Sequence, residues 1–355
     1  MKKMRVLAIE SSCDETALAV ISGPRLREEA SDWFLEKNAV FSQIAIHQKF
    51  GGVVPEVAAR KHAETIIPLL TETLGENKLA EIDYLAVTAG PGLITSLLLG
   101  VTAAKSLAYA SQKPLLPVNH MEGHIYSNWL SNVELRKNDK NYFPSLALVV
   151  SGGHTELVLM KGHGDYQLLG TTLDDASGEA FDKVAKILKL GYPGGPIVAK
   201  LALEGDENFY DLPRPMLNSG DYNFSFSGLK TAVLYTLEKE KNISQVAVKN
   251  MCASFQTAAV EILVKKTMKA AKDFAVKSVL LAGGVAANQK LKTELQSVCD
   301  KNNLPFFFPE LKYTGDNAAM IAVAAYYKLQ YSSKEALVSK NIFNLKVKSN
   351  WQIFS

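Results

Sequence analysis

The sequence predicts an α/β fold made of two similar halves. A chain of 355 residues exceeds what one hydrophobic core usually holds, so two domains are expected. A buried strand, a polar turn and a returning strand occur over residues 6–21, and the same pattern returns over residues 146–160. Helical and strand-like segments alternate between and after these two hairpins. Such alternation is typical of a layered α/β architecture.

The first half opens with the hairpin of residues 6–21, whose two apolar runs flank a polar turn. Residues 53–74 have helical spacing, and residues 84–88 are typical of a strand. Residues 93–110 predict a helix that is apolar but interrupted by Thr, Ser and Lys. We therefore expect residues 93–110 to form a buried helix and not a membrane span.

The second half repeats the scheme with a hairpin over 146–160 and then further helices and a strand. These are a helix over 176–190, a break at 192–196, a long amphipathic helix over 249–274, a strand over 278–282, and a glycine turn over 283–288 that enters another helix. We place the boundary in the polar stretch 131–142. The expected domains are an N-terminal lobe (1–135), a C-terminal lobe (136–330) and a tail (331–355) without a clear pattern.

Composition is that of an ordinary soluble globular enzyme, with 47% apolar and 21% charged residues. The net charge of +3 permits a nucleic-acid partner without requiring one. The cysteines Cys13, Cys252 and Cys299 form no CxxC pair. This pattern, with no signal peptide at the start, favours a reducing, cytoplasmic compartment.

Two histidines, His120 and His124, are four residues apart. On a helix they leave the same face with their Cβ atoms about 5–6 Å apart, so they can grip a transition metal. Asp316 can add an anionic ligand and leave open positions, as in catalytic Fe(II) or Zn(II) sites. Two alternatives stand beside this interpretation. The pair can be ordinary surface or core histidines, and Asp316 can be the N-cap of a following helix.

Two turns can bind ions. The second hairpin turn, at residues 151–155, carries two glycines, so its backbone N–H groups can form a nest for phosphate or carboxylate oxygens, although an ordinary glycine turn is as consistent. The first turn is acidic, with Glu10, Asp14 and Glu15. It therefore suits a bound cation, or a carboxylate that positions water, better than it suits a bare phosphate. In the turn at 283–288, Asn288 can donate to a ligand or simply cap the next helix.

Together these segments resemble the universal TsaD family, whose archaeal and eukaryotic members belong to the KEOPS complex. The matching segments span nearly the whole chain: IESSCDETALAV (9–20), FGGVVPEVAARKH (50–62), TAGPGLITSLLLG (88–100), HMEGH (120–124), VSGGHTEL (150–157), DDASGEAFDKVAK (174–186), YPGGP (192–196), PRPM (213–216), FSFSGLKTA (224–232), AGGVAAN (282–288) and TGDNAAMIA (314–322). Two departures are visible: Asn119, where many bacterial members have histidine, and Ala318, where they have glycine.

The resemblance implies the two-lobed actin/Hsp70/sugar-kinase (ASKHA) fold. It also implies a tRNA-modifying acyltransferase, which moves a threonylcarbamoyl group from threonylcarbamoyl-AMP to N6 of adenosine 37 in tRNAs that read codons beginning with A. Such an enzyme needs the anticodon loop of tRNA, TsaB-like and TsaE-like protein partners and a TsaC-like enzyme that supplies the adenylate. No membrane is involved.

The resemblance also implies roles for particular residues. His120, His124 and Asp316, taken from opposite lobes, are expected to hold one divalent metal ion, usually Fe(II), with Zn(II) also possible. The residues expected to contact the adenylate are Val150, Ser151, Gly152, Gly153, His154, Asp182, Gly195 and Asn288. We take Asp14 as the candidate catalytic residue that orients the amine or accepts its proton, with a salt-bridged or capping role as its alternative.

Three other functions are weighed. A metallo-endopeptidase, the activity formerly attached to this family, needs a general base beside a metal-bound water, whereas Glu122 lies two residues after His120 and points away from the shared face. A nucleotide-binding scaffold without chemistry has no use for a metal group. A sugar kinase suits the hairpins, but no sugar pocket is evident in the sequence.

Overall fold

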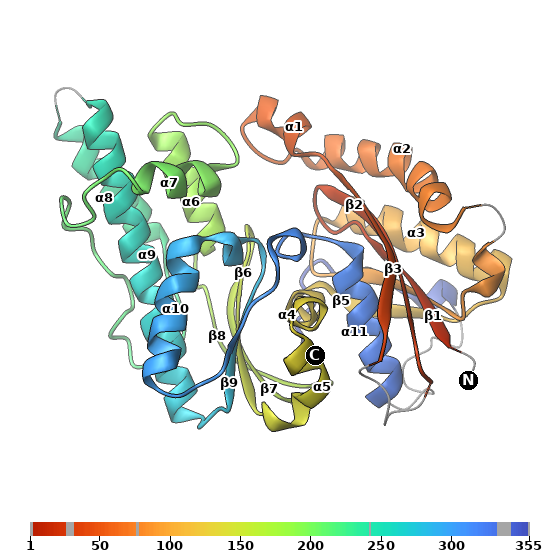
Figure 1. Cartoon of the computed structure of the whole chain (residues 1–355). Helices are drawn as coiled ribbons and strands as arrows, with labels where there is room; N and C mark the ends of the chain where they lie inside the picture. The colour runs from red at the N-terminus through yellow and green to blue at the C-terminus, as the bar shows by residue number, and fades with distance from the viewer. Residues whose placement is uncertain (1–2, 26–31, 76–77, 241–242, 332–341, 354–355) are drawn as a thin grey trace. The chain divides into compact units, whose positions relative to one another are not determined.

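The computed structural model describes residues 3–25, 32–75, 78–240, 243–331 and 342–353, and they form two compact units. The first unit comprises Met1–Asp139, Gly162–Asp165 and Pro309–Ser355. The second comprises Lys140–Lys161 and Tyr166–Phe308. Each unit has its own five-stranded mixed sheet, so the α/β prediction is confirmed (Figure 1).

The sheet of the first unit has the order β3-β2-β1-β4-β5. Its strands are β1 (Met4–Glu10), β2 (Glu15–Gly23), β3 (Phe34–Ser42), β4 (Tyr84–Gly90) and β5 (Leu115–Asn119). β1 and β2 form the predicted antiparallel hairpin. β4 runs parallel to β1, and β5 runs parallel to β4, so their carboxyl ends lie at one edge.

Helices cover this first sheet. They are α1 (Ile44–His47), α2 (Pro55–Leu74), α3 (Ile94–Ser111), α4 (His120–Ser131), α5 (Val133–Asn138) and α11 (Ala318–Tyr331), with short 3-10 turns η2 (Gln48–Phe50), η3 (Lys78–Glu81), η4 (Asp139–Asn141), η6 (Leu311–Tyr313) and η7 (Ile342–Asn344). α2 and α3 pack against each other, α2 on β2 and α3 on β4. α11 packs on β1, β2 and α4. The helices predicted over 53–74 and 93–110 are thus observed.

The second sheet repeats the first, with the order β10-β9-β6-β7-β8. Its strands are β6 (Ser145–Val150), β7 (Thr155–Gly162), β8 (Asp165–Thr171), β9 (Ser278–Ala282) and β10 (Phe306–Phe307). β6 and β7 form the second predicted hairpin, and β9 runs parallel to β6. In both sheets the first strand therefore lies between its hairpin partner and a parallel strand. This correspondence supports the predicted duplication.

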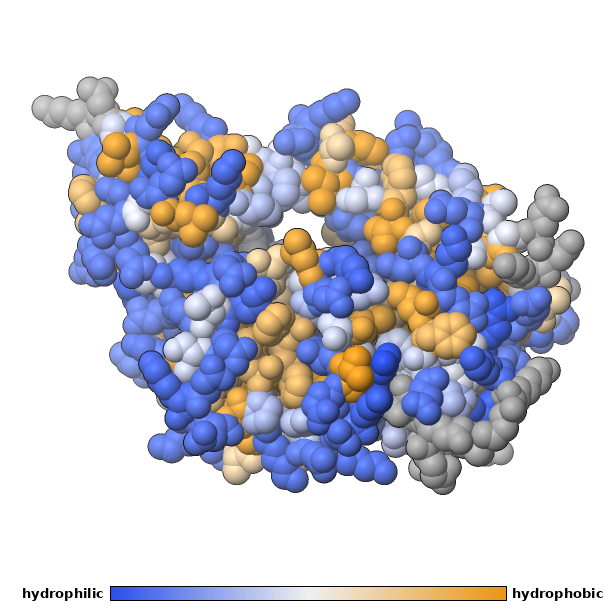
Figure 2. All heavy atoms as spheres, viewed as in Figure 1, coloured by the Kyte–Doolittle hydropathy of each residue, from blue (hydrophilic) through white to orange (hydrophobic). Residues whose placement is uncertain are grey.

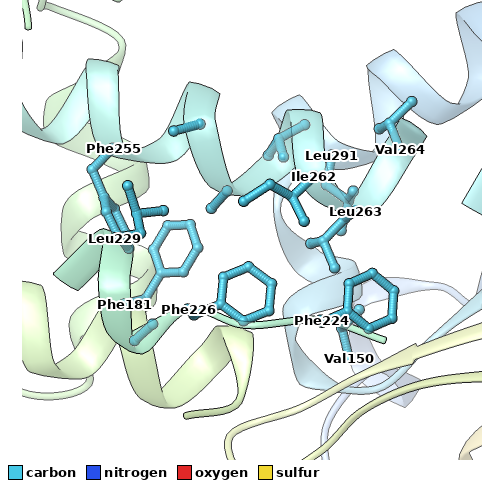
Figure 3. Close-up of a cluster of buried hydrophobic side chains, with 14 of the residues drawn as sticks. Val150, Phe181, Phe224, Phe226, Leu229, Phe255, Ile262, Leu263, Val264 and Leu291 are labelled. Atoms are coloured by element: carbon cyan, nitrogen blue, oxygen red, sulfur yellow. The ribbon is translucent and has the colours of Figure 1, made fainter. Parts of the chain in front are cut away.

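The second unit buries a large apolar core. Its helices are α6 (Ser177–Ile187), α7 (Gly194–Ala202), α8 (Ser227–Glu238), α9 (Gln245–Asp273) and α10 (Gln289–Lys301), with the turn η5 (Gly284–Ala287) after β9. Figure 3 shows Phe181, Phe224, Phe226 and Phe255 in this core, together with Val150 from the end of β6. The segment predicted as a break, residues 192–196, contains the first turn of α7.

The observed units differ from the lobes expected from the sequence. The polar stretch 131–142 does contain the division after Asp139, but it also forms α5. Residues 309–331, expected in the C-terminal lobe, belong to the first unit, because the almost uniformly apolar α11 buries its surface against β1, β2 and α4. The second unit is correspondingly shorter. The tail prediction falls partly on residues 332–341, which lie outside the described residues.

Within the described part of the chain, α3 is the one helix long and apolar enough to cross a membrane, judged by length and composition. In the structure one face of α3 packs against α2 and β4, whereas Ile94, Leu98 and Tyr109 are exposed, so the helix is only partly buried and not fully buried as predicted. The face in Figure 2 carries mostly hydrophilic residues, with smaller apolar patches among them. All three cysteines are free thiols.

Candidate metal centre and substrate turn

α4 begins where β5 ends, and Asn119 makes this possible. Its side-chain oxygen accepts hydrogen bonds from the backbone N–H groups of Met121 (2.8 Å) and Glu122 (3.4 Å), which is the bonding of a helix N-cap. His120 and His124 therefore lie one turn apart on α4, and both are buried. Their ring centroids are 4.5 Å apart. The alternative of a surface pair is excluded.

Asp316 reaches both histidines from the loop before α11. Its Oδ1 atom lies 3.3 Å from Nε2 of His120 and 3.2 Å from Nε2 of His124. The capping role is taken by the next residue, because Asn317 Oδ1 accepts a hydrogen bond from the N–H of Met320. One ligand atom from each of His120, His124 and Asp316 lies within 4.8 Å of the others. All three residues belong to the first unit, contrary to the expectation that they come from opposite lobes.

The donor set fits a divalent cation. Both ring nitrogens of His124 are buried without a well-formed hydrogen bond in the described part of the chain, and Nε2 has only the Asp316 carboxylate, 3.2 Å away. A buried nitrogen without a partner is costly, and a metal ion satisfies it. A buried carboxylate also needs a compensating charge. Two imidazoles and one carboxylate are the ligands that catalytic iron and zinc sites use.

The pKa shifts within this group also favour a bound positive charge. Burial disfavours the charged form of Asp316, but His120 and His124 outweigh it and hold the pKa of Asp316 well below its usual range. Burial likewise opposes a charge on His120, yet Asp316 and Glu10 raise the pKa of His120 well above its usual value. Burial and the neighbouring His120 lower the pKa of His124. The site thus favours one positive charge between two carboxylates.

Two residues contact His120 from the end of β1 and the turn after it, Glu10 and Ser12, and Thr88 of β4 donates a hydrogen bond to Glu10. The sequence places Glu10 in an acidic turn suited to a cation, but it does not connect Glu10, Ser12 or Thr88 to His120. One feature of the sequence does indicate that Glu10 has a partner. It is a carboxylate at the end of an otherwise apolar strand, and a buried charge needs a compensating group.

Asp14 lies at the turn between β1 and β2 and is buried. Its backbone carbonyl accepts a hydrogen bond from the N–H of Gln43 at 3.1 Å. Among the residues that the structure describes, Asp14 forms no ion pair, so the salt-bridged alternative finds no support. For the adjacent Glu15, burial and then the carboxylates of Asp316 and Asp14 raise the pKa to about 9.

Glu122 points away from the histidine pair, as expected from its spacing. Its Oε2 atom lies 3.7 Å from Nζ of Lys328 on α11, and its side chain is buried. It is not a member of the group that could hold a metal. Glu122 therefore does not supply the general base that an endopeptidase needs.

The candidate substrate turn lies in the second unit, between β6 and β7. The N–H of Ser151 donates to the carbonyl of His154 (2.8 Å), and the N–H of His154 donates to Oγ of Ser151 (3.1 Å). Gly152 and Gly153 at the tip are exposed, and a Cβ at either position meets open space. In the described residues their N–H groups make no hydrogen bond, so they can face a ligand. Val150 anchors the turn in the core (Figure 3).

The other predicted substrate residues lie on helices of the second unit. Asp182 on α6 accepts a hydrogen bond from the N–H of Gly194 at 2.7 Å, which fixes the start of α7 next to Gly195. Asn288 caps α10 through the N–H of Leu291 and donates to Oε1 of Gln256. The capping alternative for Asn288 is therefore observed. These residues belong to the second unit, whereas the metal group belongs to the first.

Sequence comparisons give consistent matches over most of the chain. Residues 35–323 match the model of the family TsaD, described as tRNA N6-adenosine threonylcarbamoyltransferase. A protein of that name from Thermosipho africanus is 48% identical over 349 residues, which cover 97% of this chain and 100% of the relative. Another from Moorella thermoacetica is 50% identical over 327 residues, 91% of each chain.

Solved structures with a similar fold are more distant in sequence. HypF of T. kodakarensis superposes with a TM-score of 0.55 at 15% identity, over 91% of this chain and 47% of that one. Full-length HypF in a phosphate- and nucleotide-bound form gives a TM-score of 0.59 at 12% identity, over 93% of this chain and 56% of that one. This chain thus spans about half the length of those proteins. At such identities the likeness shows the duplicated ASKHA fold alone, and that fold prediction is confirmed.

Proposed function

Because the chain belongs to the TsaD family, we propose that it is a tRNA N6-adenosine threonylcarbamoyltransferase. The observation that carries this proposal is the identity of 48–50% over nearly full-length relatives of that name, in a chain whose His120, His124 and Asp316 converge. The metal group also argues against a scaffold without chemistry, which would not need it.

We propose threonylcarbamoyl-AMP as the donor and N6 of adenosine 37 as the acceptor, in tRNAs that read codons beginning with A. The donor is a mixed anhydride with a good leaving group, AMP. The acceptor amine is a poor nucleophile, because its lone pair is delocalised into the adenine ring. Alignment of the two reactants and stabilisation of developing negative charge are then the main tasks of the protein.

The second unit is proposed to bind the donor. The N–H groups of Gly152 and Gly153 are the amides of the β6–β7 turn that remain for donor oxygens, because those of Ser151 and His154 are used inside the turn. Val150 supports the turn from the core, and Asp182, Gly195 and Asn288 are proposed to contact ribose and base. The amide nitrogen of Asn288 donates to Gln256, which leaves its second N–H for a ligand.

The first unit is proposed to hold one divalent cation on His120, His124 and Asp316. Fe(II) suits two histidines and one carboxylate with open positions, and Zn(II) is the alternative. When bound, such an ion supplies a Lewis acid that offsets negative charge on a donor oxygen. Asp14, in the turn after β1, is proposed to orient the acceptor amine or take its proton.

Helper proteins are proposed to share the RNA contact. The net charge of +3 is small for a protein that must hold a tRNA anticodon loop alone. We therefore propose that a TsaB-like and a TsaE-like partner assist the chain and that a TsaC-like enzyme supplies the adenylate.

Nucleoside analysis tests the activity directly. Purified chain, unmodified tRNA, threonylcarbamoyl-AMP and the two partners from the same organism are incubated, and the tRNA is digested to nucleosides. Wild-type protein should form threonylcarbamoyladenosine, Asp316→Ala should lose at least ~100-fold in rate, and Glu122→Gln should retain it. Undiminished modification by Asp316→Ala would favour the nucleotide-binding scaffold. Metal-dependent cleavage of a glycoprotein, without tRNA modification, would favour the endopeptidase.

A further inference from the structure

Glu10 is a fully buried carboxylate at the end of β1. Its Oε1 atom accepts a hydrogen bond from the N–H of Ser12 at 2.5 Å. Its Oε2 atom accepts one from Oγ1 of Thr88 at 2.5 Å and faces Nδ1 of His120 at 3.1 Å. Three groups, from the β1–β2 turn, from β4 and from α4, thus converge on one side chain. Nothing in the proposed reaction uses Glu10 directly.

The two nitrogens of His120 face different partners. Nδ1 faces Glu10 and also lies 3.2 Å from Oγ of Ser12, whereas Nε2 faces Asp316 at 3.3 Å. A carboxylate only accepts hydrogen bonds, so Glu10 requires the proton of the ring on Nδ1. Without a cation, Asp316 favours a second proton on Nε2 by the same rule, and a cation that displaces this proton binds the Nε2 lone pair. An imidazole with the opposite tautomer would present an N–H to that cation instead.

His124 has no such support in the part of the chain that the structure describes. Neither of its ring nitrogens makes a hydrogen bond there. The difference between two neighbouring histidines shows that burial on α4 alone does not fix a tautomer. Among the residues that the structure describes, His120 is thus the histidine of the pair whose Nδ1 faces a carboxylate.

We propose that Glu10 is a positioning residue of the metal centre, which holds His120 in its Nδ1–H tautomer and aims Nε2 at the cation beside Asp316. The inference rests on the proposed metal site and adds a residue that acts through His120 without touching the metal. Carboxylates that accept the second N–H of a metal-bound histidine orient the ring and increase its basicity. Glu10 also adds a buried negative charge next to the cation.

A matched pair of variants tests the proposal. Glu10→Gln keeps the shape of the side chain but can donate an N–H to Nδ1, which stabilises the wrong tautomer. Asp139→Asn makes the same change in the buried pair of Asp139 Oδ2 and His163 Nε2, at 2.7 Å, also in the first unit. Co²⁺ is titrated into each full-length protein against a competing chelator and followed by its visible absorption.

Glu10→Gln should weaken Co²⁺ binding by about 10–100-fold and change the Co²⁺ spectrum. Asp139→Asn should leave both as in the wild type. Equal affinity of wild type and Glu10→Gln would overturn the role of Glu10 while leaving the metal site intact. If the wild-type protein bound no Co²⁺, both the metal site and the inference about Glu10 would fall.

A measurement on the unaltered protein keeps the inference testable if Glu10→Gln does not fold. Histidines are labelled with ¹⁵N, Zn²⁺ is added, and the signals of His120 are assigned by comparison with His120→Gln. The expected result is a protonated Nδ1 and a metal-bound Nε2. A protonated Nε2, or a metal-bound Nδ1, would overturn the proposal.

Discussion

The hairpin turns of the two units occupy equivalent places in equivalent sheets, yet their chemistry is opposite. The acidic residues Glu10, Asp14 and Glu15 lie at the β1–β2 turn, and the buried carboxylate of Glu10 faces His120 of the histidine pair. The β6–β7 turn has exposed Gly152 and Gly153 in the corresponding place. The two turns have the same backbone arrangement, so the fold alone does not determine what each turn binds. The residues of each turn decide whether it handles a cation through side chains or an anion through backbone N–H groups.

Close packing is not what distinguishes the two turns. A Cβ at Gly92 would lie 2.5 Å from the carbonyl oxygen of Ser12 beside the first turn. A Cβ at Gly178 would lie 2.5 Å from the carbonyl oxygen of Ser151 beside the second. Each turn is thus supported by a glycine from a neighbouring segment. The difference in function follows from the charges.

The largest loss of metal affinity should come from removing one of the three proposed ligands beside the first turn. His124→Ala leaves two of the three donors, so we expect Co²⁺ affinity to fall by more than ~100-fold, beyond the loss caused by second-sphere changes. Isothermal titration with AMP, the leaving group of the proposed donor, should show unchanged binding by the second unit. A parallel loss of AMP binding would mean that the two turns do not work separately.

A carboxylate near the second turn, Glu156, should have its pKa shifted in the direction opposite to that of Glu10. Glu156 on β7 faces Val149 across the hairpin, and burial raises its pKa from 4.5 to about 7. For Glu10, in contrast, burial is outweighed by His120, and the pKa is lowered. A raised pKa in the folded state means that Glu156 favours folding below pH 4.5 and loses this contribution as the pH rises through 7.

Between pH 4.5 and 8 this loss is expected to reach up to about 3 kcal/mol in the free energy of unfolding. Glu156→Gln should remove that part of the pH dependence, as measured by urea unfolding at several pH values. Parallel curves for the wild type and Glu156→Gln would show that burial at the second turn does not disfavour a charge.

Much of this organisation is predictable from the sequence, because hairpins and glycine turns leave local patterns. The β1–β2 and β6–β7 hairpins and the spacing of His120 and His124 are of this kind. Long-range packing leaves no such pattern. α11 is apolar on all sides, so periodicity does not reveal that it packs on the first sheet and brings Asp316 into the unit that holds the histidines.

The contacts of Glu10 with His120 and of Asn119 with the tail also cannot be predicted from the sequence. They join residues that are far apart in sequence, as in the hydrogen bond from Nδ2 of Asn119 to the carbonyl of Trp351. The side chain of Asn119 thus makes this bond and also caps α4. Such roles depend on the neighbours that folding supplies.

A change at the second turn's support should affect only the second turn. Gly283 after β9 has φ +89°, and a Cβ there would lie 2.3 Å from the carbonyl oxygen of Val150. Gly283→Ala should therefore cost about 1–3 kcal/mol in strain. It should also displace Val150 and the turn that follows, which we expect to weaken AMP binding by roughly 10-fold, or about 1.4 kcal/mol in binding free energy. Co²⁺ affinity should stay at the wild-type value. Unchanged AMP binding by the folded variant would remove the β6–β7 turn from the donor site.

The smallest effect is expected at the N-cap of α4. Asn119→Ala removes the cap and the bond to Trp351 and should lower the free energy of unfolding by about 1 kcal/mol. Thermal or urea unfolding measures this change. Co²⁺ affinity should fall less than in Glu10→Gln, because the tautomer of His120 is retained. A greater loss of affinity in Asn119→Ala would place the control of ring orientation in the cap.

Anomalous X-ray diffraction from crystals grown with Fe²⁺ or Co²⁺ tests the central claim most directly. We expect one strong anomalous peak about 2 Å from Nε2 of His120, Nε2 of His124 and an oxygen of Asp316, and none at Gly152 and Gly153. A crystal with His120, His124 and Asp316 ordered but no peak among them, or with its peak at the β6–β7 turn, would contradict it.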